Sequence, residues 1–268
     1  MNQDYSTTAI DNLLYSCALK TQRGMEHFVE SHVLGFLLSG EMQFTTIAGT
    51  RTLKAGTLML ARRNQLVKAI KGPGADAEFR SVNIFLDQKT LMEYAAAHQL
   101  ESSGMSAAEA LFELPSDAFI EGYFRSLLPY FEMPERMTKA LTALKTREVL
   151  ELVLAIEPGL KDVLFDFSEP HKMDLQSVML QHYKFNVPME TFARLAGRSL
   201  ASFKRDFMKV FKTSPGQWLK QKRLEEAYRL IRYKGVKPSE AYLDVGFENL
   251  SHFSYVFKQT FGVNPSAI

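Results

Sequence analysis

Hydrophobic and polar residues follow two different periods along this chain. Between about residues 27 and 87, apolar or alternating runs are separated by glycine-centred breaks, as in HVLGFLLSGEMQFTTIAG. Short alternating runs so spaced predict several strands in a small antiparallel barrel or sandwich. Between about 88 and 157 the apolar residues recur every three or four positions, which predicts helices. Pro134 suits the first turn of the last of these, and Pro158 its end.

From Leu175 onward the pattern predicts only short helices, after a linker expected around Ser168 to Asp174. Within this region one motif occurs twice, fifty residues apart. The recurring residues are Phe203, Phe207, Phe211 and Pro215, matched by Phe253, Phe257, Phe261 and Pro265. Phenylalanines at i, i+4 and i+8 lie along one stripe of a helix, so each copy predicts an amphipathic helix with a buried aromatic side.

Each predicted helix is preceded by a suitable N-cap, Ser199 or Asn249. Ahead of each cap lies another short apolar helix, joined through Gly197 in the first copy and Gly246 in the second. Two helices joined by a tight turn form a helix-turn-helix, whose second helix enters the DNA major groove. Paired amphipathic helices also occur in helical bundles, but the residues that differ between the two copies suit a reading surface.

Charge divides the chain at the same place. From Pro170 to the end there are 16 Lys and Arg against 8 Asp and Glu, whereas the first 169 residues hold 16 basic and 22 acidic residues. A basic segment behind an acidic body often marks contact with nucleic acid or a membrane surface. By charge alone, a lysine-rich segment that only aids solubility explains the asymmetry equally well.

The remaining composition excludes several classes of protein. Cys17 is the only cysteine, so neither an intrachain disulfide nor a cysteine zinc cluster is expected. No run is apolar enough to span a bilayer and no secretory signal is visible, which favours the cytoplasm. His27 and His32 are five apart and do not form the closely spaced pair of a metal cupin. Without a phosphate-binding glycine loop or a nucleophile elbow, we expect no enzyme and no cofactor.

The stretch GFENLSHFSYVFKQTFGVNP resembles the signature of the AraC/XylS family of bacterial transcription regulators, and the resemblance covers about ninety residues, from Val178 to Ala267. RLEEAYRLI is similar to the helix that connects the two motifs of this family. The second motif departs from the family pattern, with Ala241 and Tyr242 where an Ile-Ala pair is usual and with Pro238 at an apolar position. We expect the large and small residues to have exchanged places and Pro238 to begin the helix.

The resemblance implies an α+β protein with a cupin-like β-barrel regulatory and dimerisation domain over 1–165 and a helical DNA-binding domain over 170–268. It places helix-turn-helix motifs at about 189–211 and 238–261 and a linking helix at about 216–232, where Lys220, Arg223 and Arg229 are expected to be solvated or near phosphate. The base-facing residues it implies are Ala201, Lys204 and Arg205 in the first motif and Ser251, His252, Ser254 and Tyr255 in the second. Lys209, Lys212 and Lys258 are expected at backbone phosphates.

The predicted function is sequence-specific binding of promoter DNA, with activation through RNA polymerase. Two kinds of control remain open for the barrel, a small effector in its interior or a protein partner on its surface. The apolar side of the helix expected over 134–156 suits either a homodimer contact or ordinary core packing. The rival interpretation is a cupin-like small-molecule sensor whose helical tail contacts proteins rather than DNA.

Overall fold

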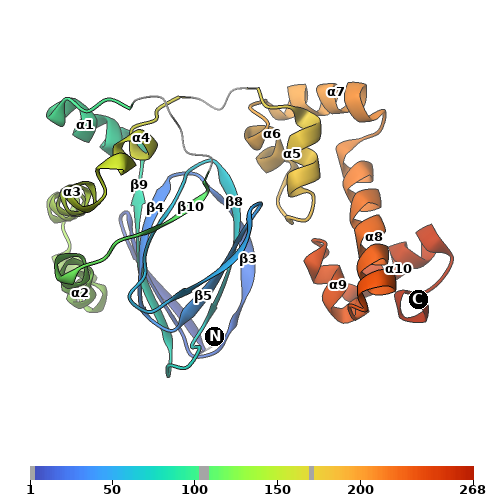
Figure 1. Cartoon of the computed structure of the whole chain (residues 1–268), viewed down its shortest axis with the longest axis horizontal. Coiled ribbons are helices and arrows are strands. Elements are labelled where there is room, and N and C mark those ends of the chain that lie inside the picture. Colours follow the sequence, from blue (N-terminus) through green and yellow to red (C-terminus); the bar gives the residue numbers. More distant parts are fainter. Residues whose placement is uncertain (1–3, 103–108, 169–171) are drawn as a thin grey trace. The chain divides into compact units, whose positions relative to one another are not determined.

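The computed structural model describes residues 4–102, 109–168 and 172–268. The chain forms two compact units, Met1–Ser168 and Glu169–Ile268 (Figure 1). The linker expected around Ser168 to Asp174 lies partly outside the described residues. Among the helices that are described, none has the length and apolar character that crossing a bilayer requires.

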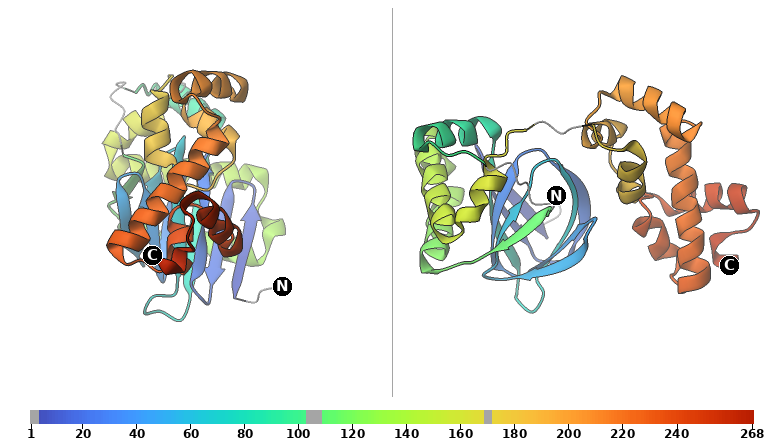
Figure 2. Two further views of the ribbon diagram at one scale, coloured as in Figure 1. Left: turned by 90° about the vertical axis from the view of Figure 1, so that its right-hand side faces the viewer. Right: turned by 45° about the horizontal axis from the view of Figure 1, so that its top comes forward.

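The first unit contains two antiparallel sheets that face each other (Figure 2). The six-stranded sheet has the order β1 (Tyr5–Ile10), β2 (Leu13–Ala18), β9 (Phe79–Leu86), β4 (His32–Ser39), β7 (Leu58–Ala61) and β10 (Leu111–Leu114). The four-stranded sheet has the order β3 (Gln22–Val29), β8 (Gln65–Gly72), β5 (Glu41–Thr46) and β6 (Gly49–Lys54). Among the described residues no backbone ladder joins the two sheets, so the β region is an incomplete barrel.

The strands begin earlier in the chain than the hydrophobic pattern indicated. β1 and β2 precede residue 27, and β10 lies in the region expected to be helical. β1 is mostly exposed and rich in hydroxyl side chains, so its pattern is weak, and its backbone is ordered by pairing with β2. β10 has only four residues and pairs with β7 at the sheet edge. β10 depends on a partner distant in sequence, and β1 joins the sheet through its hairpin with β2, which pairs with the distant β9. Local propensity does not report such pairing.

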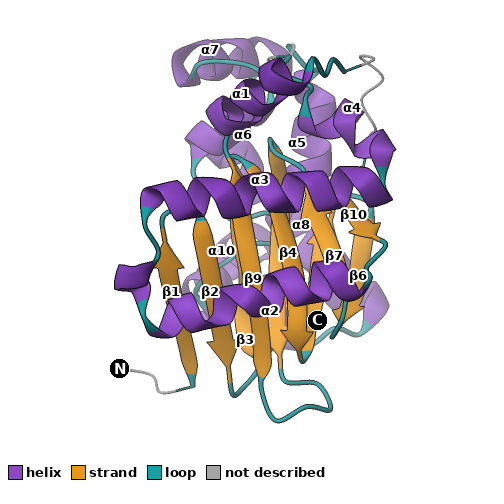
Figure 3. Cartoon of the chain, turned by 90° about the vertical axis from the view of Figure 1, so that its left-hand side faces the viewer, coloured by secondary structure: helices purple, strands orange, loops and turns teal. Residues whose placement is uncertain are grey.

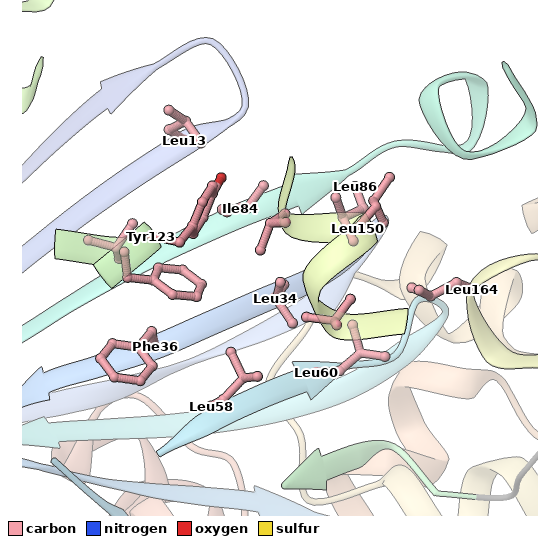
Figure 4. Packing of buried hydrophobic residues seen from close by; sticks show 14 of the residues in the cluster. Leu13, Leu34, Phe36, Leu58, Leu60, Ile84, Leu86, Tyr123, Leu150 and Leu164 are labelled. Atoms are coloured by element: carbon pink, nitrogen blue, oxygen red, sulfur yellow. The ribbon is translucent and has the colours of Figure 1, made fainter. Parts of the chain in front are cut away.

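The core of the first unit lies between the six-stranded sheet and two helices, α2 (Ala118–Glu132) and α3 (Lys139–Ile156), which cross its outer face (Figure 3). Leucines and Phe36 of the sheet meet Tyr123 and Leu150 of these helices (Figure 4). The rings of Phe36 and Phe124 stack with centroids 5.0 Å apart. A second apolar cluster, which includes Phe44 and Phe79, fills the space between the two sheets. Shorter helices, α1 (Gln88–His98) and α4 (Lys161–Leu164), complete the unit.

The helix expected from Pro134 begins later. Pro134 lies in a short 3-10 turn, Pro134–Arg136, and α3 starts at Lys139 because the Thr138 side chain caps it by accepting from the Leu141 N–H. The buried side of α3 contains Val149, Leu150 and Val153, whereas Leu144 is 61% exposed.

The second unit is entirely helical. Its helices are α5 (Leu175–His182), α6 (Met189–Leu195), α7 (Leu200–Phe211), α8 (Pro215–Lys234), α9 (Pro238–Asp244) and α10 (Leu250–Phe261), followed by the 3-10 turn Pro265–Ala267. The predicted N-caps are confirmed: Ser199 accepts from the Ser202 N–H and Asn249 from the His252 N–H. Pro238 begins α9, and the adjacent Ala241 and Tyr242 are both buried, as the exchange of large and small residues requires.

Candidate nucleic-acid interface

The phenylalanines of α7 turn one side of that helix into the core. Phe203 and Phe207 are fully buried, and the ring of Phe207 lies 4.3 Å from that of Phe211. Trp218 of α8 closes this cluster, 4.9 Å from the Phe211 ring. Exposing this aromatic stripe to water would cost free energy, so the opposite side of α7 faces solvent.

The second ladder is built the same way on the far half of α8. Phe253 and Phe257 are fully buried, with ring centroids 5.4 Å apart, and Phe261 continues the stripe. Here the partner ring on α8 is Tyr228, 5.0 Å from Phe261. The structure thus presents two equivalent outward helix faces, one on α7 and one on α10.

The outward face of α7 carries basic side chains. Ala201, Lys204 and Arg205 are exposed, and Arg205 also donates through Nη2 to the Ser202 Oγ at 3.2 Å. Lys209 and Lys212 are exposed further along. Asp206, on the flank, pairs with Arg198 at 3.1 Å; this hydrogen bond holds the pKa of the carboxyl below its usual value. The one carboxylate on this face is therefore directed to an internal partner.

The outward face of α10 is mostly neutral. Ser251, His252, Tyr255 and Lys258 are exposed, with Tyr255 at 62%. The Tyr255 hydroxyl accepts from Gln259 Nε2 at 2.6 Å. Ser254 is half-buried and lies apart from the others, because it lines a groove formed with Lys237, Pro238, Ser239, Leu250, Asn264, Pro265 and Ser266.

The linking helix differs from the expectation at one basic residue. Lys220 and Arg229 are exposed, and Arg229 pairs along the helix with Glu226 at 2.8 Å. Arg223 is instead turned inward and donates to three backbone carbonyls. A signal for this was present, since Arg223 lies at i−4 from Ala227 and i−8 from Ile231, both buried. A basic residue on the apolar stripe of a helix has to find acceptors inside the fold.

The two histidines of the β region lie on separate strands, with different surroundings. His27 is on β3 of the four-stranded sheet and His32 opens β4 of the six-stranded sheet. His32 is buried, and burial first and the positive charge of Arg63 second lower its pKa to about 3. Among the described residues no group of three or more His, Cys, Asp or Glu is placed to hold a metal ion.

Two family models match separate parts of the chain. A helix-turn-helix domain matches residues 192–268, and the ExsA N-terminal regulatory domain matches residues 32–163. The first match contains α7 and α10 with both aromatic ladders, and the second contains most of the β region with α1 to α3.

The chain is similar in sequence to proteins that are named as transcription regulators. The HTH-type transcriptional regulator ExsA of Pseudomonas aeruginosa is 26% identical over 234 residues, which are 86% of this chain and 83% of that one. The virulence regulon transcriptional activator VirF of Yersinia enterocolitica is 27% identical over 128 residues, 47% of each chain. Among solved structures, apo ToxT from Vibrio cholerae aligns over 96% of each chain with a TM-score of 0.46 and 12% identity.

The two motifs, the basic face of α7 and the domain matches on either side of residue 168 agree with one another. The protein is a DNA-binding transcription regulator and belongs to the AraC/XylS family.

Proposed function

We propose that one copy of the helical unit binds an asymmetric promoter site by placing α7 and α10 in two successive major grooves. The observation that carries the proposal is the pair of helices with matching buried ladders and different outward faces, joined by a single helix, α8. At about 1.5 Å per residue, a helix of 20 residues is about 30 Å long. That length is close to one turn of DNA, about 34 Å.

The outward side chains divide into base and phosphate contacts. Lys204 and Arg205 suit guanine, which offers two acceptors in the major groove, and Ala201 suits a thymine methyl. In the second motif Ser251, His252, Ser254 and Tyr255 suit phosphate, water or thymine-methyl contacts. The lysines assigned to backbone phosphates are Lys209, Lys212 and Lys258. Most of the sequence preference therefore belongs to α7.

The bound protein acts as an activator in the cytoplasm, by contact with RNA polymerase and without chemistry on its ligands. Support comes from VirF, a relative that is named as a transcriptional activator.

The β unit controls this activity by binding a small effector or a protein partner. Its outer helix α3 exposes Leu144 beside Ala143 and Ala140, which suits contact with a second copy. Sedimentation of the full chain and of Leu144→Asp tests this: a monomeric wild type at tens of micromolar would contradict the dimer.

The two-groove proposal is tested with DNA of altered length. A site is first selected by the full chain from a random pool, and then five or ten base pairs are inserted between its two half-contacts. Five base pairs put the second groove on the opposite face and should abolish tight binding. Ten restore the face but exceed the reach of a rigid α8, so binding should remain weak. Equal affinity for the native and the ten-base-pair sites would contradict the proposal.

A further inference from the structure

We infer that Arg223 is a positioning residue that sets the angle between the two reading helices, α7 and α10. It thereby sets the one spacing between the two half-contacts of the DNA site that the protein accepts. The inference rests on the proposed DNA binding. Arg223 lies on α8, between the two helix-turn-helix motifs, and its guanidinium bonds to backbone of segments that precede and follow that helix in the sequence. The side chain therefore connects two parts of the unit that α8 alone would join only through its ends.

The three acceptors come from two different segments. Nε donates to the Tyr183 carbonyl at 2.7 Å and Nη2 to the Phe185 carbonyl at 2.8 Å, both in the loop that follows α5. Nη1 donates to the Gly246 carbonyl at 3.0 Å, in the turn between α9 and α10. One planar group thus holds the loop after α5 against the turn that precedes the second reading helix.

The loop after α5 belongs to the first motif. The chain just before α5 is bonded to the turn between α6 and α7, since the Met173 N–H donates to the Ala196 carbonyl at 3.3 Å. Arg198, in the same turn, donates to the Met173 carbonyl at 2.8 Å. A displacement of the loop relative to Gly246 is therefore a displacement of the first motif relative to the second.

Two further bonds cross the same junction. Lys184 Nζ pairs with Glu226 of α8 at 2.8 Å, and Asn186 Nδ2 donates to Glu248 Oε1 at 2.6 Å. Gly246, at φ +88°, has no room for a side chain because a Cβ there would collide with the Lys184 carbonyl. The two segments are in close contact, and Arg223 is the member of the junction that bonds to both of them.

An arginine is suited to this position and a lysine is not. The guanidinium presents several N–H donors in a fixed planar fork, whereas an ammonium group is a single point with freely rotating donors. Hydrogen bonds from a charged donor are roughly twice as strong as neutral ones. Without them, the junction would retain the Lys184–Glu226 and Asn186–Glu248 bonds, and the first motif would depend more on its aromatic contact with α8, through Phe207, Phe211 and Trp218. It could then rotate about that contact.

The test compares Arg223→Gln with Lys222→Gln in the full chain. Both remove one positive charge from neighbouring positions of α8, but the ion pair of Lys222 is with Glu225, at 3.6 Å within the same helix. Affinity is measured for the site selected by wild type and for the same site lengthened or shortened by one base pair. Each base pair changes the spacing by about 3.4 Å and the angle by about a tenth of a turn.

We expect wild type and Lys222→Gln to bind the selected site at least tenfold more tightly than the altered spacings. For Arg223→Gln this affinity ratio should be at least threefold lower. A stability defect alone would weaken binding to all three sites equally and leave the ratio unchanged. An unchanged ratio in a folded Arg223→Gln would overturn the inference. If wild type binds no DNA specifically, the proposed function fails instead, and the inference is then decided by the distance measurement below.

That measurement needs no DNA. Spin labels are attached through Glu190→Cys on α6 and Glu240→Cys on α9, both exposed, in a Cys17→Ser background. Pulsed electron paramagnetic resonance should give a narrow distance distribution for wild type and Lys222→Gln, and a broader one for Arg223→Gln. If Arg223→Gln fails to fold, the milder Asn186→Ala and Lys184→Gln variants should broaden the distribution to a smaller degree. Equal widths in all folded variants would overturn the inference.

Discussion

The two helix-turn-helix motifs share a scaffold and differ in almost everything that faces outward. In both, three phenylalanines line the buried side of the second helix and a ring on α8 closes the cluster, Trp218 in one and Tyr228 in the other. The exposed side is cationic on α7 and mostly neutral on α10. Burial constrains the aromatic positions because a large side chain must fit its neighbours, whereas exposed positions are free to vary.

The turns of the two motifs are also different. The helix starts of α6 and α9 are 49 residues apart, whereas those of α7 and α10 are 50 apart, so the second turn is one residue longer. In the first turn Arg198 pairs with Asp206. In the second, Phe247 packs its ring 5.2 Å from Phe253. An ion pair and an aromatic contact thus do the same work of fixing the angle between two helices.

The largest expected effect comes from removing a buried phenylalanine, which should unfold one motif and leave the other folded. Phe207→Ala and Phe257→Ala each remove a fully buried ring, which should cost about 3–5 kcal/mol of unfolding free energy. Trp218 is the only tryptophan and contacts the first ladder, so its fluorescence reports on the first motif. We expect a red shift at room temperature for Phe207→Ala alone, with the exposed Met208→Ala as control. An equal shift for Phe257→Ala would mean that the two motifs unfold together.

The outward faces are compared by DNA binding. Arg205→Ala should weaken binding to the selected site by about 1–3 kcal/mol and relax the preference at one base pair, because a guanidinium reads guanine through two hydrogen bonds. Tyr255→Ala should cost less, since its face is mostly neutral. Lys209→Ala serves as the contrast: as a phosphate contact it should weaken all sequences alike and reduce the salt slope by about 1. A uniform loss in Arg205→Ala would reassign that residue to phosphate.

Acid should weaken the junction between the motifs. The hydrogen bond from Arg229, and then that from Lys184, lower the pKa of Glu226 from 4.5 to about 2. Because the folded-state pKa is below the unfolded one, the carboxylate stabilises the fold above about pH 4.5, and this contribution is lost as pH falls toward 2. The stability difference between wild type and Glu226→Gln should therefore be large near neutral pH and shrink below about pH 4.

Chemical denaturation at several pH values measures this difference. The matched control is Glu225→Gln, whose half-exposed carboxylate contacts Lys222 on the same helix and does not cross the junction. Its effect should be small at every pH, since exposed pairs contribute about 0–1 kcal/mol. A pH-independent stability difference for Glu226→Gln would mean that the Lys184–Glu226 ion pair does not stabilise the junction.

The smallest effects concern the ends of the two reading helices. The C-cap residues of α7 and α10 are Lys212 and Gly262, both in the left-handed region, at φ 56° and 78°. A side chain there is strained whereas glycine is not. We expect Gly262→Ala to destabilise by about 1 kcal/mol and Lys212→Gly to stabilise by up to about 1 kcal/mol. A Cβ at Gly262 meets no atom within 4 Å, so denaturant midpoints should report the backbone alone. Effects of the same sign in both variants would contradict this reading of the caps.

Much of the helical unit could be predicted from the sequence because its signals are local. A ladder at i, i+4 and i+8, the polar caps before α7 and α10 and the prolines that begin α8 and α9 all act within a dozen residues of chain. The same holds for the basic balance of that region. In the β unit the pattern indicated strands and helices but missed β1, β2 and β10. β2 and β10 pair with the distant strands β9 and β7, and β1 joins the sheet through its hairpin with β2.

The amino-acid sequence alone specifies which sides of α7 and α10 are buried, because no other arrangement hides six phenylalanines. It also determined their caps and the family resemblance. The place of Arg223, the position of Ser254 at a groove and the exposure of Leu144 on α3 depend on the tertiary fold. Each of these depends on which backbone or side chain arrives from elsewhere in the chain, and the spacing of residues along one helix contains no information about that.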